Sequence, residues 1–232
     1  AACRDDAARA ALRQVRPFLG VPLLLKDLGV AVAHRELPSR MGSRLFPHGQ
    51  RWSLDGELTR RYVAAGFVPF GRTTTPEMGI SASTEALAYG GPTRNPWHEA
   101  HSAGGSSGGA AAALASGAVT IAHANDGAGS IRIPASACGL IGLKPSRGLM
   151  PTGPLAGEGW GGLTTDHVLT RSVRDCAAAL DATAGADEGA PYAAPAAAGA
   201  FARTLPMPPR GLRIALVDTF FEGDAVHAEV AA

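Results

Sequence analysis

Hydrophobic and polar positions alternate along the chain in a way that predicts helices and strands in turn. Residues 4–15 place Ala and Leu at helical spacing among charged positions, and Pro17 and Gly20 then break the pattern. The apolar segment VPLLLKD at 21–27 has the length of a strand. The chain therefore opens with a predicted helix followed by a predicted strand.

A second helix and strand follow in the same order. Residues 54–66 repeat apolar positions at helical spacing and end at a glycine. The apolar side of this helix is formed by Leu58, Tyr62, Val63 and Ala65. Residues 67–73 then predict a strand, in which Pro69 favours a sheet edge or a bulge because proline cannot donate to a strand ladder.

Two further helices and one strand complete the pattern. Residues 110–116 predict a helix, and residues 119–125 predict the strand after it. A fourth helix begins at the capping box Ser172-x-x-Asp175 and extends to about residue 182. Alternation of this kind predicts a layered α/β fold.

The composition changes toward the C-terminal end. Residues 185–211 consist mostly of Ala, Pro and Gly, which predicts a long surface connection within one domain. Residues 213–218, RIALVD, have the character of another strand. Because the chain starts at Ala1 and ends at Ala232 within a helix-like stretch, we expect residues 1–232 to form a single incomplete domain.

The charge balance limits the classes of partner. The 232 residues include 21 Lys and Arg against 20 Asp and Glu, a formal net charge of +1, so no basic surface indicates nucleic acid. No apolar run has the length of about 18 residues that a membrane span needs, and the start lacks the pattern of a secretion signal. We therefore expect a cytoplasmic protein without a nucleic-acid or membrane partner.

Neither the cysteines nor the histidines form a metal-binding pattern. Cys3, Cys138 and Cys176 are an odd number without metal-ligand spacing, and the last two lie in apolar segments, which indicates buried thiols in a reducing compartment. His98 and His101 are three residues apart, whereas a zinc-binding H-E-x-x-H helix places them four apart. We expect no metal site.

The segment GGSSGG at 104–109 has three interpretations. A flexible spacer is the ordinary one, but this segment runs directly into an alanine helix, which favours close backbone approach instead. A phosphate-binding loop needs a lysine after the glycines, and none follows. A nucleophile elbow, G-x-S-x-G, is matched around Ser106 and Ser107 but should end a buried strand, where this chain has polar residues and Pro96. An α/β-hydrolase is therefore a less favoured alternative.

Two other segments carry candidate chemistry. Lys26 ends an apolar strand, where a lysine that reaches water is the ordinary explanation. Gly127, Gly129 and Ser130 follow the strand at 119–125 in a predicted tight turn. Successive N–H groups in such a turn form an anion-binding nest or serve only the structure.

The remaining polar and aromatic candidates have simpler roles. His123 is predicted to be a hydrogen-bonded strand residue and no catalyst. Trp97, Trp160 and Tyr89 fit either the walls of a pocket or the core.

Taken in order, these segments resemble the amidase signature family. The resemblance runs from about residue 17 to 181 and includes KD at 26–27, GGSSGG at 104–109, DGAGSIRIPA at 126–135 and GLKPSRG at 142–148. It implies an α/β amidase signature fold with a central mixed β-sheet flanked by helices, of which this chain holds the N-terminal half to two-thirds.

The resemblance also implies hydrolysis of carboxamides by a Ser-Ser-Lys triad through an acyl-enzyme. The family's general base falls on Lys26, its bridging serine in a cis peptide bond on Ser106, and its nucleophile on Ser130. The 24-residue separation of the two serines is the family's usual one. Burial beside the apolar strand would lower the pKa of the lysine from about 10.4 and provide the neutral amine that a base requires.

Groups around the triad have implied roles as well. The oxyanion hole is expected from the N–H groups of Gly127, Ala128, Gly129 and Ser130. Ser107 would steady its own loop, and Asp126 and Arg132 would pair or bond to backbone to hold the turn, unless they are solvated charges. No cofactor and no metal are implied, the partner is a small-molecule amide, and a homodimer is expected for the full-length protein.

Three functions stay open. The first is an amidase, and the segment from DGAGS to PSRG, together with GSRLF, is most similar to the branch that includes 6-aminohexanoate cyclic dimer hydrolases. The second is an inactive fragment or pseudo-enzyme, whose motifs persist without a completed pocket. If nothing replaces the missing second half, exposed apolar sheet surface is expected to make this chain poorly stable. The third is the amide-transferring subunit of a tRNA-modifying complex, an amidotransferase.

Overall fold

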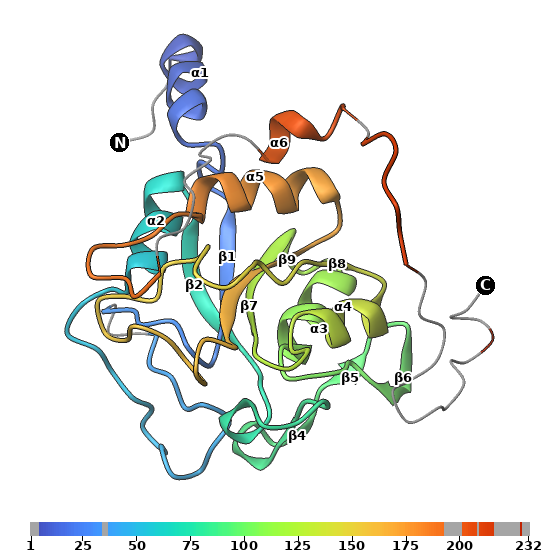
Figure 1. Ribbon diagram of the computed structural model, residues 1–232. Helices are drawn as coiled ribbons and strands as arrows, with labels where there is room; N and C mark the ends of the chain where they lie inside the picture. Colours follow the sequence, from blue (N-terminus) through green and yellow to red (C-terminus); the bar gives the residue numbers. More distant parts are fainter. Residues whose placement is uncertain (1–4, 34–36, 193–200, 208, 216–227, 229–232) are drawn as a thin grey trace.

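A five-stranded mixed sheet forms the centre of the molecule (Figure 1). The computed structural model describes residues 5–33, 37–192, 201–207, 209–215 and 228. Across the sheet the strands are β2 (Val68–Thr73), β1 (Pro22–Lys26), β7 (Ile121–Asp126), β9 (Thr165–Thr170) and β8 (Ile141–Gly142). Strand β1 runs parallel to β2 and β7, whereas β9 runs antiparallel to β7 and β8. The predicted central mixed sheet is confirmed.

Helices cover both faces of this sheet. Helices α2 (Glu57–Ala65) and α5 (Val173–Thr183) pack on one face, and α3 (Gly108–Ala115) and α4 (Arg132–Cys138) pack on the other. Because side chains alternate along a strand, Leu23 and Leu25 of β1 join the first core while Leu24 packs against the second. The result is a three-layer α/β arrangement, which confirms the predicted fold class.

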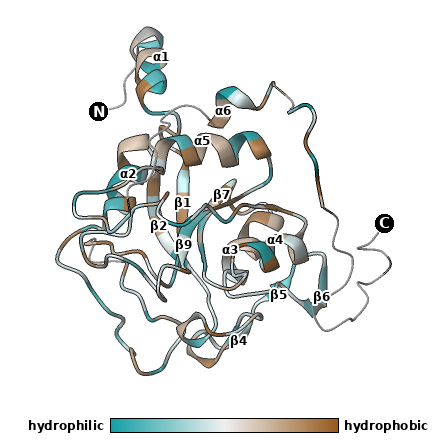
Figure 2. Ribbon diagram, viewed as in Figure 1, coloured by the Kyte–Doolittle hydropathy of each residue, from teal (hydrophilic) through white to brown (hydrophobic). Residues whose placement is uncertain are grey.

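Smaller elements lie around these layers. Helix α1 (Asp6–Val15) extends away from the sheet in Figure 1, and Figure 2 shows hydrophilic and hydrophobic residues along it. The other short elements are η1 (Glu77–Gly79), β3 (Glu85–Ala86), η2 (Leu87–Tyr89), β4 (Gly91–Pro92), β5 (Arg94–Asn95), β6 (His98–Ser102) and α6 (Phe201–Thr204). Strands β3 and β4 form one antiparallel pair, and β5 and β6 form another.

The structure confirms several local predictions. Strand β2 lies at the sheet edge, and its register with β1 shifts between Leu23 and Leu24, opposite Pro69. The Ser172 hydroxyl accepts a hydrogen bond from the N–H of Asp175 at the start of α5, as the capping box predicts. The prediction for Val63 is wrong: this residue was placed on the apolar side of the helix but is 48% exposed. The side of α2 that packs on the sheet is narrower than the set of apolar positions in the sequence.

The described residues cover only part of the segments for which C-terminal predictions were made. Within the connection predicted at 185–211, α6 packs next to α5, where the carboxylate of Asp181 accepts the N–H groups of Phe201 and Ala202. Residues 193–200 and 208 lie outside the described residues. The strand expected at 213–218 is absent over 213–215, where the side chains lie exposed with no strand beside them; residues 216–218 are not among those described.

The cysteines and the membrane prediction can be checked briefly. Cys138 and Cys176 are buried free thiols, as expected, whereas Cys3 lies outside the described residues. Burial raises the pKa of the Cys176 thiol to about 11. Among the described residues, no helix is both long enough and apolar enough to cross a bilayer.

Candidate active site

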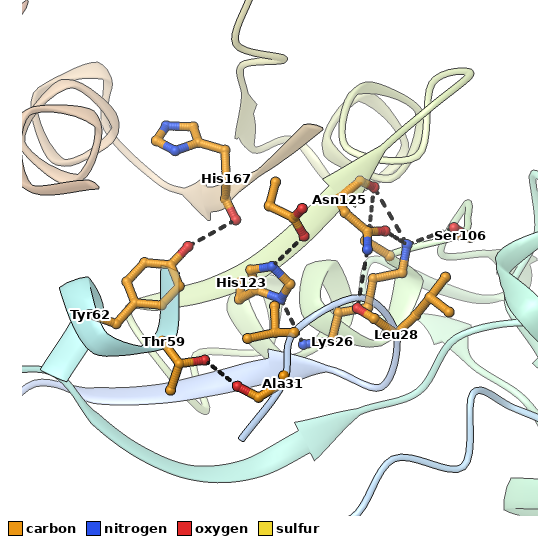
Figure 3. A network of polar contacts seen from close by, with 12 residues as sticks. Lys26, Leu28, Ala31, Thr59, Tyr62, Ser106, His123, Asn125 and His167 are labelled. Carbon is orange, nitrogen blue, oxygen red and sulfur yellow. Dashed lines mark hydrogen bonds and ion pairs between the residues drawn. The ribbon is translucent and has the colours of Figure 1, made fainter. Parts of the chain in front are cut away.

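Lys26 is the last residue of β1, which lies between β2 and β7 in the sheet. Its side chain does not reach water: the residue is 0% exposed, and Nζ lies 2.6 Å from the hydroxyl oxygen of Ser106 (Figure 3). Burial lowers the pKa of this lysine from 10.5 to about 7, against the opposing effects of the carboxylates of Asp166 and Asp126. The interpretation that the Lys26 side chain reaches water at the end of its strand is therefore wrong. Its burial agrees with what the resemblance implied.

The residue after Lys26 belongs to the scaffold. The carboxylate of Asp27 accepts the N–H of Arg40 and the hydroxyl of Tyr89, so it turns away from the amine. Arg72 donates to the main-chain oxygens of Lys26, Leu37 and Val30 and thereby fixes the chain that leaves β1.

Ser106 lies in the loop before α3, and the Gly105–Ser106 peptide bond is cis, as the resemblance implies. The flanking glycines are packed against neighbouring backbone. A Cβ atom on Gly105 would come 2.6 Å from the main-chain oxygen of Ser83, and one on Gly109 would come 2.4 Å from the nitrogen of Thr74. The flexible-spacer interpretation is wrong, because side chains larger than hydrogen do not fit here.

This packing predicts that Gly109→Ala destabilises the chain although it lies in a helix. Helix propensity alone favours Ala over Gly by about 1 kcal/mol, whereas overpacking costs about 1–3 kcal/mol, so we expect a net loss. Urea unfolding of the variant measures the change. Gly157→Ala is the matched control because a Cβ there would make only ordinary contacts, the nearest at 3.7 Å. Equal free energies of unfolding for the two variants would contradict the prediction.

The loop does not match a nucleophile elbow. The polar segment before it forms β6, an exposed strand paired with β5 outside the central sheet, although the sequence favoured no strand there. An elbow must end a buried strand of the main sheet. The α/β-hydrolase alternative therefore fails. The two histidines considered as metal ligands, His98 and His101, lie on β6 with ring centroids 4.7 Å apart.

Ser130 lies in the turn between β7 and α4, and Asp126 organises this turn. The Asp126 carboxylate accepts the N–H groups of Gly129 at 2.6 Å and Ile131 at 3.1 Å. It also accepts two hydrogen bonds from the Arg132 guanidinium, at 2.9 and 3.0 Å. Burial opposes its charge, but the bonds from Arg132 and the backbone outweigh this and lower the pKa of Asp126. The predicted pairing of Asp126 with Arg132 is confirmed.

This arrangement changes the expected oxyanion hole. The Gly129 N–H points to Asp126, so Gly129 is not available as a donor and its assignment is corrected. Within the described chain, no protein acceptor takes the N–H groups of Gly127, Ala128 and Ser130. Three of the four expected donors stay open.

The two serine loops meet, but their hydroxyls do not. The N–H of Ser107 donates to the main-chain oxygen of Ser130 at 3.3 Å, and the Ser107 hydroxyl donates to the main-chain oxygen of Asn125 at 3.3 Å. Ser107 thus steadies both loops, as predicted. No hydrogen bond between described residues joins the hydroxyls of Ser106 and Ser130, so only the first link of the expected Lys-Ser-Ser chain is formed.

Three polar residues around Lys26 were not predicted as partners. Asn125 contacts the amine directly, with Oδ1 2.5 Å from Nζ. His123 is fully buried; its Nδ1 accepts the main-chain N–H of Lys26 at 3.1 Å, and its Nε2 lies 3.0 Å from a carboxylate oxygen of Asp166. Its place in β7 and its two hydrogen bonds agree with the predicted hydrogen-bonded strand residue, and burial lowers its pKa. Because side chains two residues apart lie on the same face of a strand, the sequence could have indicated that His123 and Asn125 share one face of β7. Nothing in the sequence indicated Asp166, which lies in β9.

A cleft of about 390 Å³ opens over the two serines. Ser106 and Ser130 line it together with Trp160, Met78 and Leu155. Trp160 and Met78 have left-handed backbone, with φ of 50° and 52°, and such conformations in larger residues cluster at functional sites. In the described part of the chain, no group of three or more His, Cys, Asp or Glu side chains is placed to hold a metal ion.

Of the three aromatic candidates, only Trp160 forms a wall of this cleft. Trp97 is 73% exposed and its indole N–H donates to the main-chain oxygen of Cys138. Tyr89 donates to Asp27 and accepts the N–H of Gly42. Both serve the loops outside the cleft.

Comparison with known proteins agrees with this geometry. The amidase family model matches residues 1–232. A 6-aminohexanoate-cyclic-dimer hydrolase from Paenarthrobacter ureafaciens is 43% identical over 219 residues, which are 93% of this chain and 44% of that protein. This chain therefore spans less than half the length of that relative.

Solved structures of related enzymes are similar to this chain as well. A structure of 6-aminohexanoate cyclic dimer hydrolase complexed with substrate aligns with a TM-score of 0.76 at 42% identity, covering 87% of this chain and 42% of that one. A glutamyl-tRNA(Gln) amidotransferase subunit from Thermotoga maritima aligns with a TM-score of 0.64 at 33% identity, covering 74% of this chain and 36% of that one.

Proposed function

Because this chain belongs to the amidase signature family, we propose that it carries the Ser-Ser-Lys machinery of an enzyme that hydrolyses carboxamides. The observation that carries the proposal is the contact of 2.6 Å between the amine of Lys26 and the hydroxyl of Ser106, both fully or almost fully buried. A lysine with a pKa of about 7 is largely neutral slightly above neutral pH and can act as a base.

The nucleophile is Ser130, and its proton leaves through Ser106. As the Ser130 oxygen bonds to the amide carbon, its proton passes to the Ser106 oxygen, which gives its own proton to Lys26. This relay requires the two hydroxyls to approach each other. Catalytic hydrogen bonds are often long without substrate and tighten in the complex, and both serines line one cleft, so we expect substrate binding to bring the two hydroxyls together.

The negative charge that develops on the amide oxygen needs donors. The N–H groups of Gly127, Ala128 and Ser130 donate to no acceptor among the described residues, and Gly127 and Ser130 line the cleft. Donors of this kind are worth about 2.7–4 kcal/mol each. Asp126 contributes indirectly, because its bonds to Gly129, Ile131 and Arg132 hold the turn in shape.

Collapse of the tetrahedral intermediate completes the first half of the reaction. Ser106 passes a proton to the leaving nitrogen as the carbon–nitrogen bond breaks, and Lys26 returns the proton that it took up. A water molecule then attacks the acyl-enzyme on Ser130, with the same relay removing its proton, and releases the carboxylic acid.

A small amide with an aliphatic chain is the substrate class that we propose. The cleft wall of Trp160, Met78 and Leu155 is apolar. The relatives with 42–43% identity are named as hydrolases of the 6-aminohexanoate cyclic dimer, so this cyclic amide is the first compound to assay. Similarity to the amidotransferase is lower, at 33% identity, and the formal net charge of +1 gives no support for tRNA binding.

Labelling with a fluorophosphonate tests the proposal on this chain. The reagent needs only an activated serine and an oxyanion hole, so it separates an active amidase centre from a pseudo-enzyme. We expect one phosphonyl group on the tryptic peptide 95–132, which fragmentation assigns to Ser130. Absence of labelling, or labelling of Ser106 or Ser107 instead, would contradict the assignment.

A further inference from the structure

Asn125 places two oxygen atoms around the amine of Lys26 (Figure 3). Nζ lies 2.5 Å from Oδ1 of Asn125 and 3.4 Å from its main-chain oxygen. The third neighbour of the amine is the Ser106 hydroxyl, at 2.6 Å. These three oxygens are the hydrogen-bond partners of Nζ among the described residues.

The orientation of the Asn125 amide is fixed from its other side. Its Nδ2 donates to the main-chain oxygen of Leu28 at 3.1 Å, which leaves Oδ1 directed at the lysine. A flipped amide would place Oδ1 against that carbonyl oxygen, and two acceptors would then meet. Gly29 makes room for the contact, because a Cβ atom there would come 2.5 Å from Nδ2.

The chemistry of the three oxygens determines how a neutral lysine can bind. A neutral amine has two hydrogens and one lone pair. A main-chain oxygen and an amide oxygen can only accept, whereas a hydroxyl can also donate. The two hydrogens of the amine therefore bond to Asn125, and the lone pair is left for the hydroxyl hydrogen of Ser106.

We infer that Asn125 is a positioning residue for the general base: by accepting both N–H groups of neutral Lys26, it directs the lone pair to Ser106. This inference rests on the proposed function, because it assumes that Lys26 takes the proton of Ser106. It assigns to Asn125 a part that proton transfer needs and that burial alone does not supply.

The neutrality of the Asn125 side chain matters as well. Asp166 and Asp126 already act on Lys26 from β9 and from the end of β7, and both favour its charged form. The imidazole of His123 contacts the lysine backbone from β7, and Arg72 does so from β2. An added carboxylate at position 125 would lie in direct contact with the amine and hold it protonated.

Asn125→Asp and Asn125→Leu test the inference, since both keep the approximate side-chain volume. The rate of fluorophosphonate labelling of this chain is measured from pH 6 to 10. For Asn125→Asp we expect the midpoint of the profile to rise by at least about one pH unit, so that labelling at pH 7 falls about fivefold or more and recovers above about pH 9. For Asn125→Leu, which accepts no hydrogen bond, we expect a loss of about tenfold or more at every pH, without an upward shift of the midpoint.

Nuclear magnetic resonance gives a readout that does not depend on activity. The chain has two lysines, Lys26 and Lys144, so ¹³C labelling at Cε yields two signals. In Asn125→Asp the Lys26 signal is expected to titrate at higher pH while the Lys144 signal is unchanged. Asn95→Asp is the matched control: Asn95 is also buried and its Nδ2 donates to the main-chain oxygen of Ala137, but it does not contact Lys26.

The outcomes separate the inference from the proposed function. If the parent chain shows no labelling at Ser130, the proposed function fails. If the parent is labelled but Asn125→Asp leaves both the profile and the Lys26 titration in place, or Asn125→Leu labels at the parental rate, the positioning role is wrong. Should Asn125→Asp not unfold cooperatively, Asn125→Leu and its pH-independent loss decide the question by themselves.

Discussion

Ser130→Ala is expected to lower the rate of fluorophosphonate labelling by about 10⁴-fold or more, to the level of the unfolded chain. Removal of a serine nucleophile elsewhere costs up to about 10⁶-fold in turnover, since the other members of the unit then have nothing to activate. Ser130 lies in the turn that carries the open N–H groups, whereas Ser106 lies in the loop before α3 and is assigned to the relay through its contact with Lys26. The rate is measured with a fluorescent reagent in excess.

The control for this variant is Ser136→Ala. Ser136 lies exposed on α4, the helix that follows the turn, and makes no side-chain contact with the cleft. Its replacement should leave the labelling rate unchanged. If Ser130→Ala is still labelled, and the label is on Ser106, the roles of the two serines must be exchanged. The assignment of Ser130 as the nucleophile would then be wrong.

Lys26→Met is expected to lower labelling about 10²- to 10⁴-fold, the range that general base catalysis contributes. Methionine fills a similar volume but takes up no proton near neutral pH. In the parent, labelling should rise with pH through a midpoint near 7 and level off above it, because only the neutral amine accepts a proton. The variant should lose this pH dependence.

Lys26→Met should raise the free energy of unfolding although it lowers the rate of labelling. Lys26 has a pKa of about 7 in the folded chain, below its ordinary 10.5, so between these values the unfolded chain binds more protons. The free energy of unfolding of the parent therefore rises by about 1.4 kcal/mol per pH unit between pH 7 and 10.5. Below pH 7 the lysine is protonated in both states, so its titration contributes no further change. The Met variant carries no such penalty, so its advantage is greatest near pH 7 and declines as the pH rises toward 10.5.

Urea unfolding at several pH values from 7 to 9.5 measures this decline. The lost hydrogen bonds of Nζ to Ser106 and Asn125 offset part of the gain, but they shift the whole curve and leave its slope unaltered. Lys144→Met, at the other lysine, is the control variant for the loss of one lysine side chain. A difference between parent and Lys26→Met that does not vary with pH would show that the amine is not held neutral by burial.

Loss of activity combined with gain of stability marks Lys26 as a functional residue. A buried amine without a paired carboxylate in contact is costly, and a chain selected for stability alone would place an apolar residue there. The surrounding atoms lower that cost without neutralising the lysine by an ion pair: Asn125 and Ser106 supply neutral oxygens. These are the conditions under which a lysine works as a base at neutral pH.

Prediction from the sequence succeeded where the information is contiguous. The apolar segment before Lys26, the capping box at Ser172 and the glycine pattern around Ser106 depend on neighbours within a few residues, and period and turn chemistry are local properties. The two serine loops could be assigned to chemistry because each holds an unusual run of residues. Strand β9 was missed, since Asp and His are poor indicators of a buried strand and Asp166 finds its partner His123 far away along the chain.

The sequence by itself determined the layered α/β class, through alternating patterns along the chain, and it indicated two serines and a lysine as candidate site residues, because each lies in a distinctive short segment. Only the tertiary structure decided that Asn125 surrounds the amine, that His123 and Asp166 hold the strand end, and that Asp126 takes the N–H of Gly129. The physical reason is that a hydrogen bond depends on ångström-scale placement of both partners. That placement is set by how strands and helices far apart in the sequence pack together, which no local pattern encodes.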